Sequence, residues 1–256
     1  MDSPVTSTGP AQPRSPAWPI RTGAVPPLAG GFITRPETVP GLAAALAPGA
    51  VVVLADGQAG SGQLGSCGKT QLALYSAESL RRCGQVDLLA WVDASSRASV
   101  LAGYVQAAAA VGIDPAGAAG QVAARFTGWM AETARPWLVV LDDLRDAADL
   151  DGLWPRGPAG RVLITTPGED AVAGQPQAQV VAVGAFSTRE AMNYLMGLLA
   201  DDPEQRNGAI DLALMLSGDP CALTHAGAVI TTTTQTCRDY QRRYADRRAS
   251  RSVYCC

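Results

Sequence analysis

One segment of the chain limits the possible folds more than any other: an apolar run, a glycine-rich stretch and a helical pattern follow one another without interruption. The run over residues 50–55 is continuous and rich in β-branched side chains, which is typical of a strand buried on both faces of a parallel sheet. The glycine-rich stretch over residues 56–68 leads into Gly68-Lys69-Thr70, where a helical pattern begins. Glycines let backbone N–H groups turn inward, and the N-terminus of the helix adds partial positive charge. Together these features predict a loop that cradles a phosphate group.

Lys69 is the only lysine among the 20 basic residues, and all the others are arginines. An ammonium group is a compact point charge, whereas a guanidinium is a broad planar fork. The retained lysine therefore indicates a position where arginine does not serve, with survival by chance as the alternative. Within the predicted loop, Lys69 would reach the β- and γ-phosphates of a nucleotide, and Thr70 would offer its hydroxyl to Mg²⁺.

Strand and helix patterns alternate along the chain as far as residue 186. Four further buried strands are expected, over residues 86–92, 137–142, 161–166 and 179–183. From Thr188 onward all patterns are helical, over residues 188–199, 204–216, 221–230 and 236–248. We predict an α/β fold with a parallel five-stranded sheet sandwiched by helices, followed by a C-terminal helical subdomain.

The same reading divides the chain into four parts. The first residues are rich in Pro, Ser, Thr and Gly, which is typical of a flexible segment. The expected parts are a flexible leader (1–27), a nucleotide-binding core (28–186), a helical lid (187–250) and a short tail (251–256).

A second motif places two carboxylates at the end of an apolar strand. Leu138-Val139-Val140-Leu141 is followed directly by Asp142 and Asp143. Ligands of open α/β sheets bind at the carboxyl ends of the strands. Asp142 would hold Mg²⁺ through its water shell, and Asp143 would polarise an attacking water. The alternative is that both residues merely begin a loop.

Composition excludes several classes of protein. The chain is 47% hydrophobic with a net charge of −3, so it is neither a disordered chain nor globally attracted to nucleic acid. No window approaches the roughly 20 unbroken apolar residues of a membrane span. The six cysteines lack metal-site spacing, and the N-terminus lacks a secretory signal pattern. We therefore expect a cytoplasmic protein with reduced thiols and no membrane partner.

The ordered set of motifs resembles the signal-transducing P-loop ATPases of the STAND class, in particular the NB-ARC domain of actinobacterial regulators with tetratricopeptide repeats. Residues 68–73 look like the Walker A motif of that family, and residues 141–143 look like its Walker B motif. Residues 161–166 look like its sensor strand, and Pro220 stands in a segment that resembles its GxP motif. Arg35 lies in a segment that resembles the one placed against adenine in the family. The resemblance implies ATP or ADP with Mg²⁺ as cofactors.

The predicted site combines the phosphate cradle with the residues that the resemblance implies. Thr70 and Asp142 are expected to hold the metal, and Asp143 is the expected catalytic residue. The expected nucleotide-binding residues are Arg35, Gly65, Ser66, Cys67, Gly68, Lys69, Thr70, Gln71 and Pro220.

Three departures from the family pattern bear on turnover. Gln63 stands where Walker A has its first glycine, and the loop is about five residues longer than usual. Pro167 replaces the arginine that often follows the sensor threonines, and it has no N–H to donate. We therefore expect an ATP/ADP-binding signalling switch with slow or absent hydrolysis, at most a weak ATPase. The alternative is a catalytically decayed P-loop protein that acts as a non-enzymatic interaction module.

Partners are expected to be proteins rather than nucleic acids. Relatives couple this core to a winged-helix segment and a repeat sensor, whereas this chain ends soon after Arg251. We expect either a fragment that lacks its C-terminal repeat domain or a module that acts on separate protein partners, and oligomerisation stays open. The arginines of the last helix are interpreted as a solvated face rather than a nucleic-acid surface, and His225 as a core or surface residue rather than a catalytic base.

Overall fold

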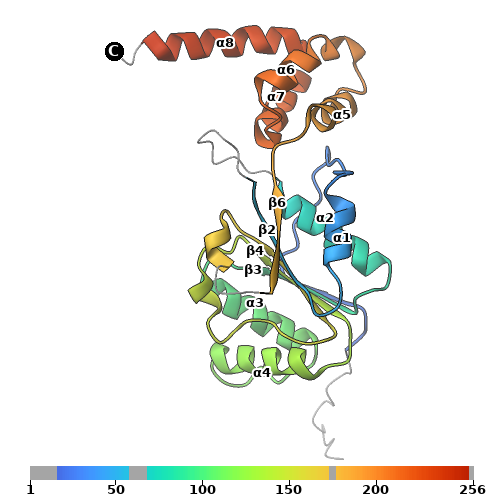
Figure 1. The fold of residues 1–256 in the computed structure, drawn as a ribbon, viewed down its shortest axis with the longest axis vertical. Coiled ribbons are helices and arrows are strands. Elements are labelled where there is room, and N and C mark those ends of the chain that lie inside the picture. The colour runs from blue at the N-terminus through green and yellow to red at the C-terminus, as the bar shows by residue number, and fades with distance from the viewer. Residues whose placement is uncertain (1–15, 58–67, 173–176, 254–256) are drawn as a thin grey trace, which may run out of the picture.

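A computed structural model describes residues 16–57, 68–172 and 177–253, and its centre is a parallel sheet (Figure 1). Six strands lie in the order β1-β3-β4-β5-β2-β6, and every neighbouring pair is parallel. All their carboxyl ends therefore meet at one edge of the sheet. The strands are β1 (Ile20–Thr22), β2 (Val51–Asp56), β3 (Leu88–Asp93), β4 (Trp137–Asp142), β5 (Gly160–Thr165) and β6 (Ala178–Val183).

The predicted α/β class and parallel sheet are confirmed, but the sheet has one strand more than predicted. The additional strand is β1, which pairs with β3 in the register Ile20↔Leu88. It lies inside the segment expected to be a flexible leader. Three residues after a proline carry no periodic pattern, so β1 forms because the exposed edge of β3 offers it a partner.

Helices cover both faces of the sheet. On one face α1 (Val39–Ala45) and α2 (Lys69–Arg82) pack against alternate strand residues such as Val52 and Leu54. On the other, α3 (Arg97–Ala110) and α4 (Ala119–Glu132) pack against residues such as Val53. Strands buried on both faces must be apolar at every position, which explains the continuous runs in the sequence.

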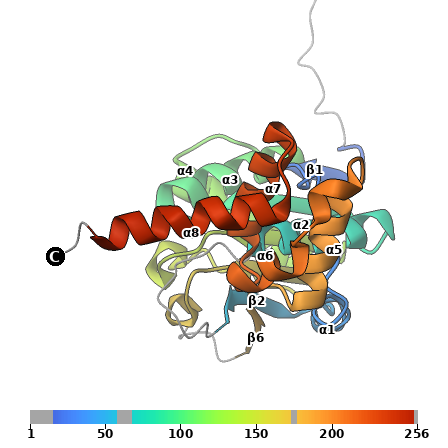
Figure 2. The same cartoon turned by 90° about the horizontal axis from the view of Figure 1, so that it is seen from above.

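The last four helices form a separate layer beyond the carboxyl edge of the sheet (Figures 1 and 2). Their shared core includes Leu195, Leu212, Leu223 and Ile230. We call them the helical subdomain; they are α5 (Thr188–Leu198), α6 (Ala209–Met215), α7 (Pro220–Thr233) and α8 (Cys237–Val253). Residues 184–187 connect this subdomain to β6.

One predicted helix of the subdomain is wrong. Instead of a single helix over residues 204–216, the chain forms a 3-10 turn at Pro203–Arg206 and then α6. Gly208 separates the two with a φ of 87°, a conformation that L side chains rarely adopt and that ends a helix.

Within the described residues, no helix is both long enough and apolar enough to cross a membrane.

Candidate functional site

The first residues of α2 lie at the carboxyl edge of the sheet because β2 runs to that edge before the chain turns back. Gly68 caps the helix with a φ of 78°, so the sharp turn uses a conformation that favours glycine. Lys69 and Thr70 are the first two helical residues. Gly65, Ser66 and Cys67 lie outside the described residues.

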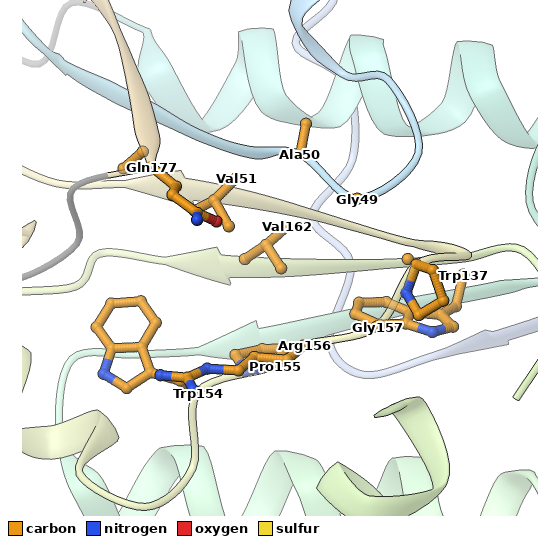
Figure 3. A pocket seen from close by; sticks show the side chains of 13 residues that line it. Gly49, Ala50, Val51, Trp137, Trp154, Pro155, Arg156, Gly157, Val162 and Gln177 are labelled. Atoms are coloured by element: carbon orange, nitrogen blue, oxygen red, sulfur yellow. The ribbon is translucent and has the colours of Figure 1, made fainter. Parts of the chain in front are cut away.

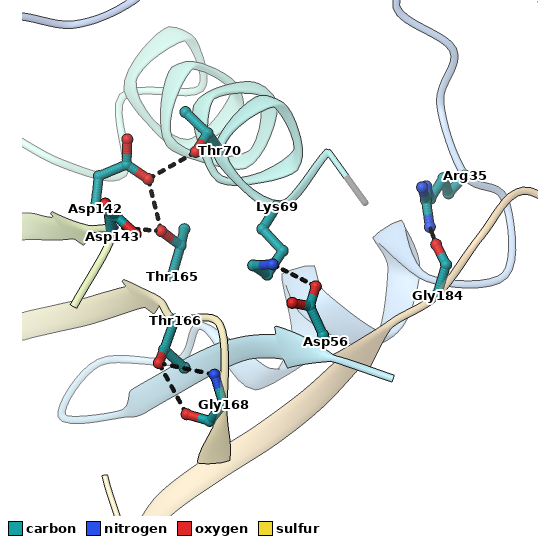
Figure 4. Close-up of polar contacts among 10 residues, drawn as sticks. All are labelled: Arg35, Asp56, Lys69, Thr70, Asp142, Asp143, Thr165, Thr166, Gly168 and Gly184. Carbon is teal, nitrogen blue, oxygen red and sulfur yellow. Dashed lines mark hydrogen bonds and ion pairs between the residues drawn. The ribbon is translucent and has the colours of Figure 1, made fainter. Parts of the chain in front are cut away.

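The structure brings the side chains of Thr70 and Asp142 together. The Thr70 hydroxyl donates to Asp142 Oδ1 at 2.8 Å, and the Thr165 hydroxyl donates to the same oxygen at 2.6 Å (Figure 4). Thr165 in turn accepts the backbone N–H of Asp143 at 2.8 Å. This network holds the Asp142 carboxylate and the Thr70 hydroxyl side by side, although they come from different elements.

Lys69 is not isolated: its Nζ forms an ion pair with Asp56 Oδ1. The side chains are 14% and 29% exposed, respectively, so both are largely withdrawn from solvent. Asp56 is the last residue of β2, and Thr165 is the last residue of β5, the strand that pairs with β2. We call Asp56, Lys69, Thr70, Asp142 and Thr165 the polar cluster.

Asp143 points elsewhere. Its backbone has a φ of 63°, a strained value for a residue that is not glycine. Its Oδ2 accepts from Arg145 Nη2 at 2.7 Å and from Arg145 Nε at 3.1 Å. The hydrogen bond and charge of Asp143 raise the pKa of Arg145. Among the described contacts, the carboxylate of Asp143 is therefore directed to an arginine rather than to the polar cluster.

A cavity of about 750 Å³ opens between the start of α2 and the helical subdomain. Among its lining residues from α7, Cys221, Thr224, His225, Ala228 and Thr231 fall on one helical face, at spacings of three and four. All of these except His225 have small side chains. We call it the large cavity; it is lined by Ala29, Gly30, Gly31, Phe32, Ile33, Arg35, Gly68, Gln71, Leu72, Phe186, Tyr194, Leu198, Pro220, Cys221, Thr224, His225, Ala228 and Thr231.

The predicted residues Arg35 and Gln71 both line the large cavity and hold its walls. Arg35 Nη1 donates to the Gly184 carbonyl at 2.7 Å, and its guanidinium lies 4.8 Å from the centre of the Phe186 ring. Arg35 is 6% exposed, so it ties the connection between sheet and subdomain to the segment before α1. Gln71 Oε1 accepts the Ala29 N–H at 2.7 Å.

The turn before α7 places Pro220 at the cavity wall. Gly218 has a φ of 67°, and a Cβ there would lie 2.1 Å from the Phe186 carbonyl oxygen. Asp219 caps α7: its Oδ1 accepts the Ala222 N–H at 2.6 Å. Pro220 then occupies the first turn of the helix, where the missing N–H costs nothing.

A second cavity, of about 570 Å³, lies at the amino edge of the sheet and contains no predicted site residue (Figure 3). Its walls include Val51, Trp137 and Val162 from strand starts, with Trp154 and Arg156 from the loop before β5.

Three features of the site escaped the sequence analysis. By sequence pattern, Asp56 is an ordinary acid and Arg145 an ordinary base. Only the pairing of Asp56 with Lys69 and of Arg145 with Asp143 gives these two residues a role. The one available signal for Asp56 was a carboxylate at a strand end, where the glycine-rich stretch begins. His225, interpreted as a core or surface residue, lines the large cavity, which depends on how α7 is placed.

Comparisons with known proteins show the fold. No protein-family model matches the sequence, and no curated protein sequence matches it. A Signal Transduction ATPase with Numerous Domains (STAND) protein with a tetratricopeptide repeat sensor, from Pyrococcus horikoshii, is similar in structure at 16% identity and a TM-score of 0.53, covering 78% of this chain and 30% of that one.

Two archaeal proteins give similar results. CDC6P from Pyrobaculum aerophilum matches at 10% identity and a TM-score of 0.54, covering 83% of this chain and 65% of that one. The Aeropyrum pernix ORC1 protein, whose structure was solved in complex with DNA, matches at 15% identity and a TM-score of 0.51, covering 85% and 67%. This chain thus shares the fold of these structures, and it spans only part of the length of each of them.

Proposed function

We propose that this chain binds ATP or ADP with Mg²⁺ and acts as a signalling switch that hydrolyses ATP slowly or not at all. The observation that carries the proposal is the placement of the polar cluster next to a large apolar cavity, with Gly68 at their junction. A nucleotide has the same division, since one end is a charged phosphate chain and the other a flat base.

The polar cluster fits a magnesium-bound phosphate chain. Lys69 supplies a positive charge, and the backbone at the start of α2 adds its partial charge. The Thr70 hydroxyl and the Asp142 carboxylate, 2.8 Å apart, would hold the ion, with waters and phosphates as its remaining ligands. Bound Mg²⁺ supplies neutralisation of phosphate charge. Among the described residues no group of three or more metal-binding acids, histidines or cysteines gathers, which suits an ion that keeps its waters.

The large cavity fits the base. Its lining is mostly apolar, and its volume lies in the range of small-molecule sites. Pro220 offers a flat apolar surface at the start of α7, and Thr224 and His225 add polar groups on the same helical face.

Slow turnover is supported by the surroundings of Asp143. A residue that activates water has to face the phosphate chain, whereas the Asp143 carboxylate pairs with Arg145. Pro167 supplies no donor after the Thr165-Thr166 pair, and the Thr166 hydroxyl donates to the Gly168 carbonyl at 2.8 Å. Neither Pro167 nor the Thr166 hydroxyl is therefore placed to contact a γ-phosphate as a sensor.

Switching is supported by the position of the cavity between two layers of the molecule. A ligand that touches both α2 and α7 binds best when they lie at one particular distance, so it favours one arrangement of the helical subdomain. We propose that this lid movement regulates a protein partner or a repeat domain outside this chain, as in the NB-ARC proteins that the sequence resembles. The STAND neighbour, which carries a tetratricopeptide repeat sensor, fits this proposal.

The second candidate is a decayed P-loop protein that acts only through protein contacts. The observation that favours it is that both candidate phosphate-site charges already have partners, Lys69 with Asp56 and Asp143 with Arg145.

Calorimetric titration with ADP and ATP in the presence of Mg²⁺ separates the two candidates. We expect Lys69→Ala to weaken binding by about 10- to 100-fold, because a partly buried cation contact to phosphate is lost. Arg81→Ala removes one positive charge from the same helix, far along it, and should leave affinity nearly unchanged. No binding by the wild type, or equal affinity of wild type and Lys69→Ala, would favour the decayed module.

A further inference from the structure

We propose that Asp56 is an internal competitor of the nucleotide phosphates: its carboxylate neutralises Lys69 in the ligand-free protein and thereby lowers the affinity of the site. This inference rests on the proposed function, because it assigns Lys69 to phosphate binding. It adds a residue that sets affinity and that neither the motif pattern nor the comparisons assign.

The geometry of the pair carries the proposal. Asp56 is the last residue of β2 and Lys69 is the first residue of α2, so the ion pair joins the two elements that flank the glycine-rich stretch. With side-chain exposures of 14% for Lys69 and 29% for Asp56, the pair is shielded from much of the solvent. Figure 4 shows the ammonium group turned toward Asp56, while Thr70 reaches toward Asp142 on the other side.

The neighbouring charges are engaged elsewhere, which makes the pairing selective. Asp142 accepts from Thr70 and Thr165, and Asp143 is bound by Arg145. Within residues 16–57, 68–172 and 177–253, Lys69 is the cation that the structure places on Asp56. Asp56 is therefore the counter-ion of Lys69.

Binding of a phosphate chain then has to replace one anion around Lys69 by another. The displaced carboxylate stays near the ligand, because it is fixed to the end of β2, a strand that is paired on both sides, with β5 and with β6. Like charges at short range repel, and the repulsion grows with the charge of the ligand. The penalty is therefore expected to be larger for ATP than for ADP. Asn in place of Asp56 keeps the shape of the side chain and removes both effects.

The test is calorimetric titration of Asp56→Asn with ADP and ATP at fixed Mg²⁺. We expect affinity to rise by about 3- to 10-fold, the size of a partly exposed ion pair, with the larger gain for ATP. The matched control is Asp93→Asn, which removes the same charge at the same edge, at the end of β3, where Asp93 instead accepts the Ser95 N–H. Screening should keep its effect below about twofold.

A second measurement needs no nucleotide. Thermal unfolding of the ligand-free wild type, Asp56→Asn, Lys69→Met and the double variant forms a double-mutant cycle. We expect coupling: the double variant should lose less stability than the two single losses added together, because neither charge is left unpaired. Additive losses in that cycle would overturn the inference.

The outcomes separate the inference from the function on which it rests. If Lys69→Ala weakens binding but Asp56→Asn does not tighten it, the nucleotide site stands and Asp56 is no competitor. If neither the wild type nor Asp56→Asn binds nucleotide, the proposed function and the inference both fail. A gain in Asp56→Asn that disappears in Asp56→Asn/Lys69→Ala supports both.

Discussion

The polar cluster and the large cavity lie next to each other, yet the chain builds them in opposite ways. The polar cluster consists of side chains at the ends of adjoining or nearly adjoining strands and at the start of the helix that follows one of them. The large cavity is enclosed by a segment before α1, the start of α2 and two helices of the subdomain. The first is stabilised by hydrogen bonds and one ion pair, whereas the second is a space left between packed layers.

The two parts of the site should therefore respond differently to substitutions. The strand ends are held in place by the neighbouring strands, so the geometry of the polar cluster depends on its own few side chains. The cavity depends on the placement of a whole subdomain, which is joined to the sheet through residues 184–187. Substitutions that move the subdomain should therefore harm base binding while sparing phosphate binding.

The largest effect is expected for Gly218→Ala. A Cβ there would lie 2.1 Å from the Phe186 carbonyl oxygen, and the φ of 67° is unfavourable for alanine. We expect the helical subdomain to lose about 3 kcal/mol of stability, measured by urea unfolding. Gly197→Ala is the control, because it lies in α5 with nothing within 4 Å of the added atom, and it should be neutral or stabilising. Equal stability of the two variants would show that the Gly218 turn does not position α7.

A cavity-filling substitution sharpens the comparison. Ala228 is exposed on the α7 face that lines the large cavity, so Ala228→Leu should occupy the space that we propose for the base. We expect ADP affinity to fall by about tenfold, or ~1.4 kcal/mol, while magnesium pyrophosphate binds as before. Thr232→Leu adds an apolar side chain on the same helix outside the cavity lining and should change neither. A parallel loss of pyrophosphate binding would place both ligands in the large cavity.

The smallest effect is expected for Gln71→Ala. Gln71 accepts the Ala29 N–H at 2.7 Å and donates to the Pro27 carbonyl at 3.3 Å, and so holds one wall of the cavity to α2. Because both contacts are exposed, their loss should cost about 1 kcal/mol of stability and a few-fold in ADP affinity. Gln121→Ala, which removes a comparable bond to the Ala118 N–H in α4, should lower stability without altering ADP binding. Identical ADP affinity in both variants would remove Gln71 from the site.

Much of the fold could be predicted because the sheet is buried on both faces. Runs such as residues 137–141 have no polar position to disguise them, and the structure places strands at all five predicted locations. The prediction that all five are buried is wrong for β6, which lies at the edge of the sheet and exposes several of its residues. The strand Ile20–Thr22 could not be predicted, since its only cause is an open edge on β3. The break at Gly208 was missed because Glu204, Gln205 and Arg206 are good helix formers, and a single glycine decides the backbone after them.

For the candidate site, the sequence by itself determined the positions that a local motif fixes. These are Lys69 and Thr70 at the start of a helix, and Asp142 at the end of a strand. A short chain segment fixes such positions, because strand, turn and helix follow one another directly. Only the tertiary structure decided that Asp56 pairs with Lys69, that Asp143 turns to Arg145 and that α7 lines a cavity with His225. These contacts join residues that are distant in the sequence, or depend on one backbone angle, and no local pattern encodes either.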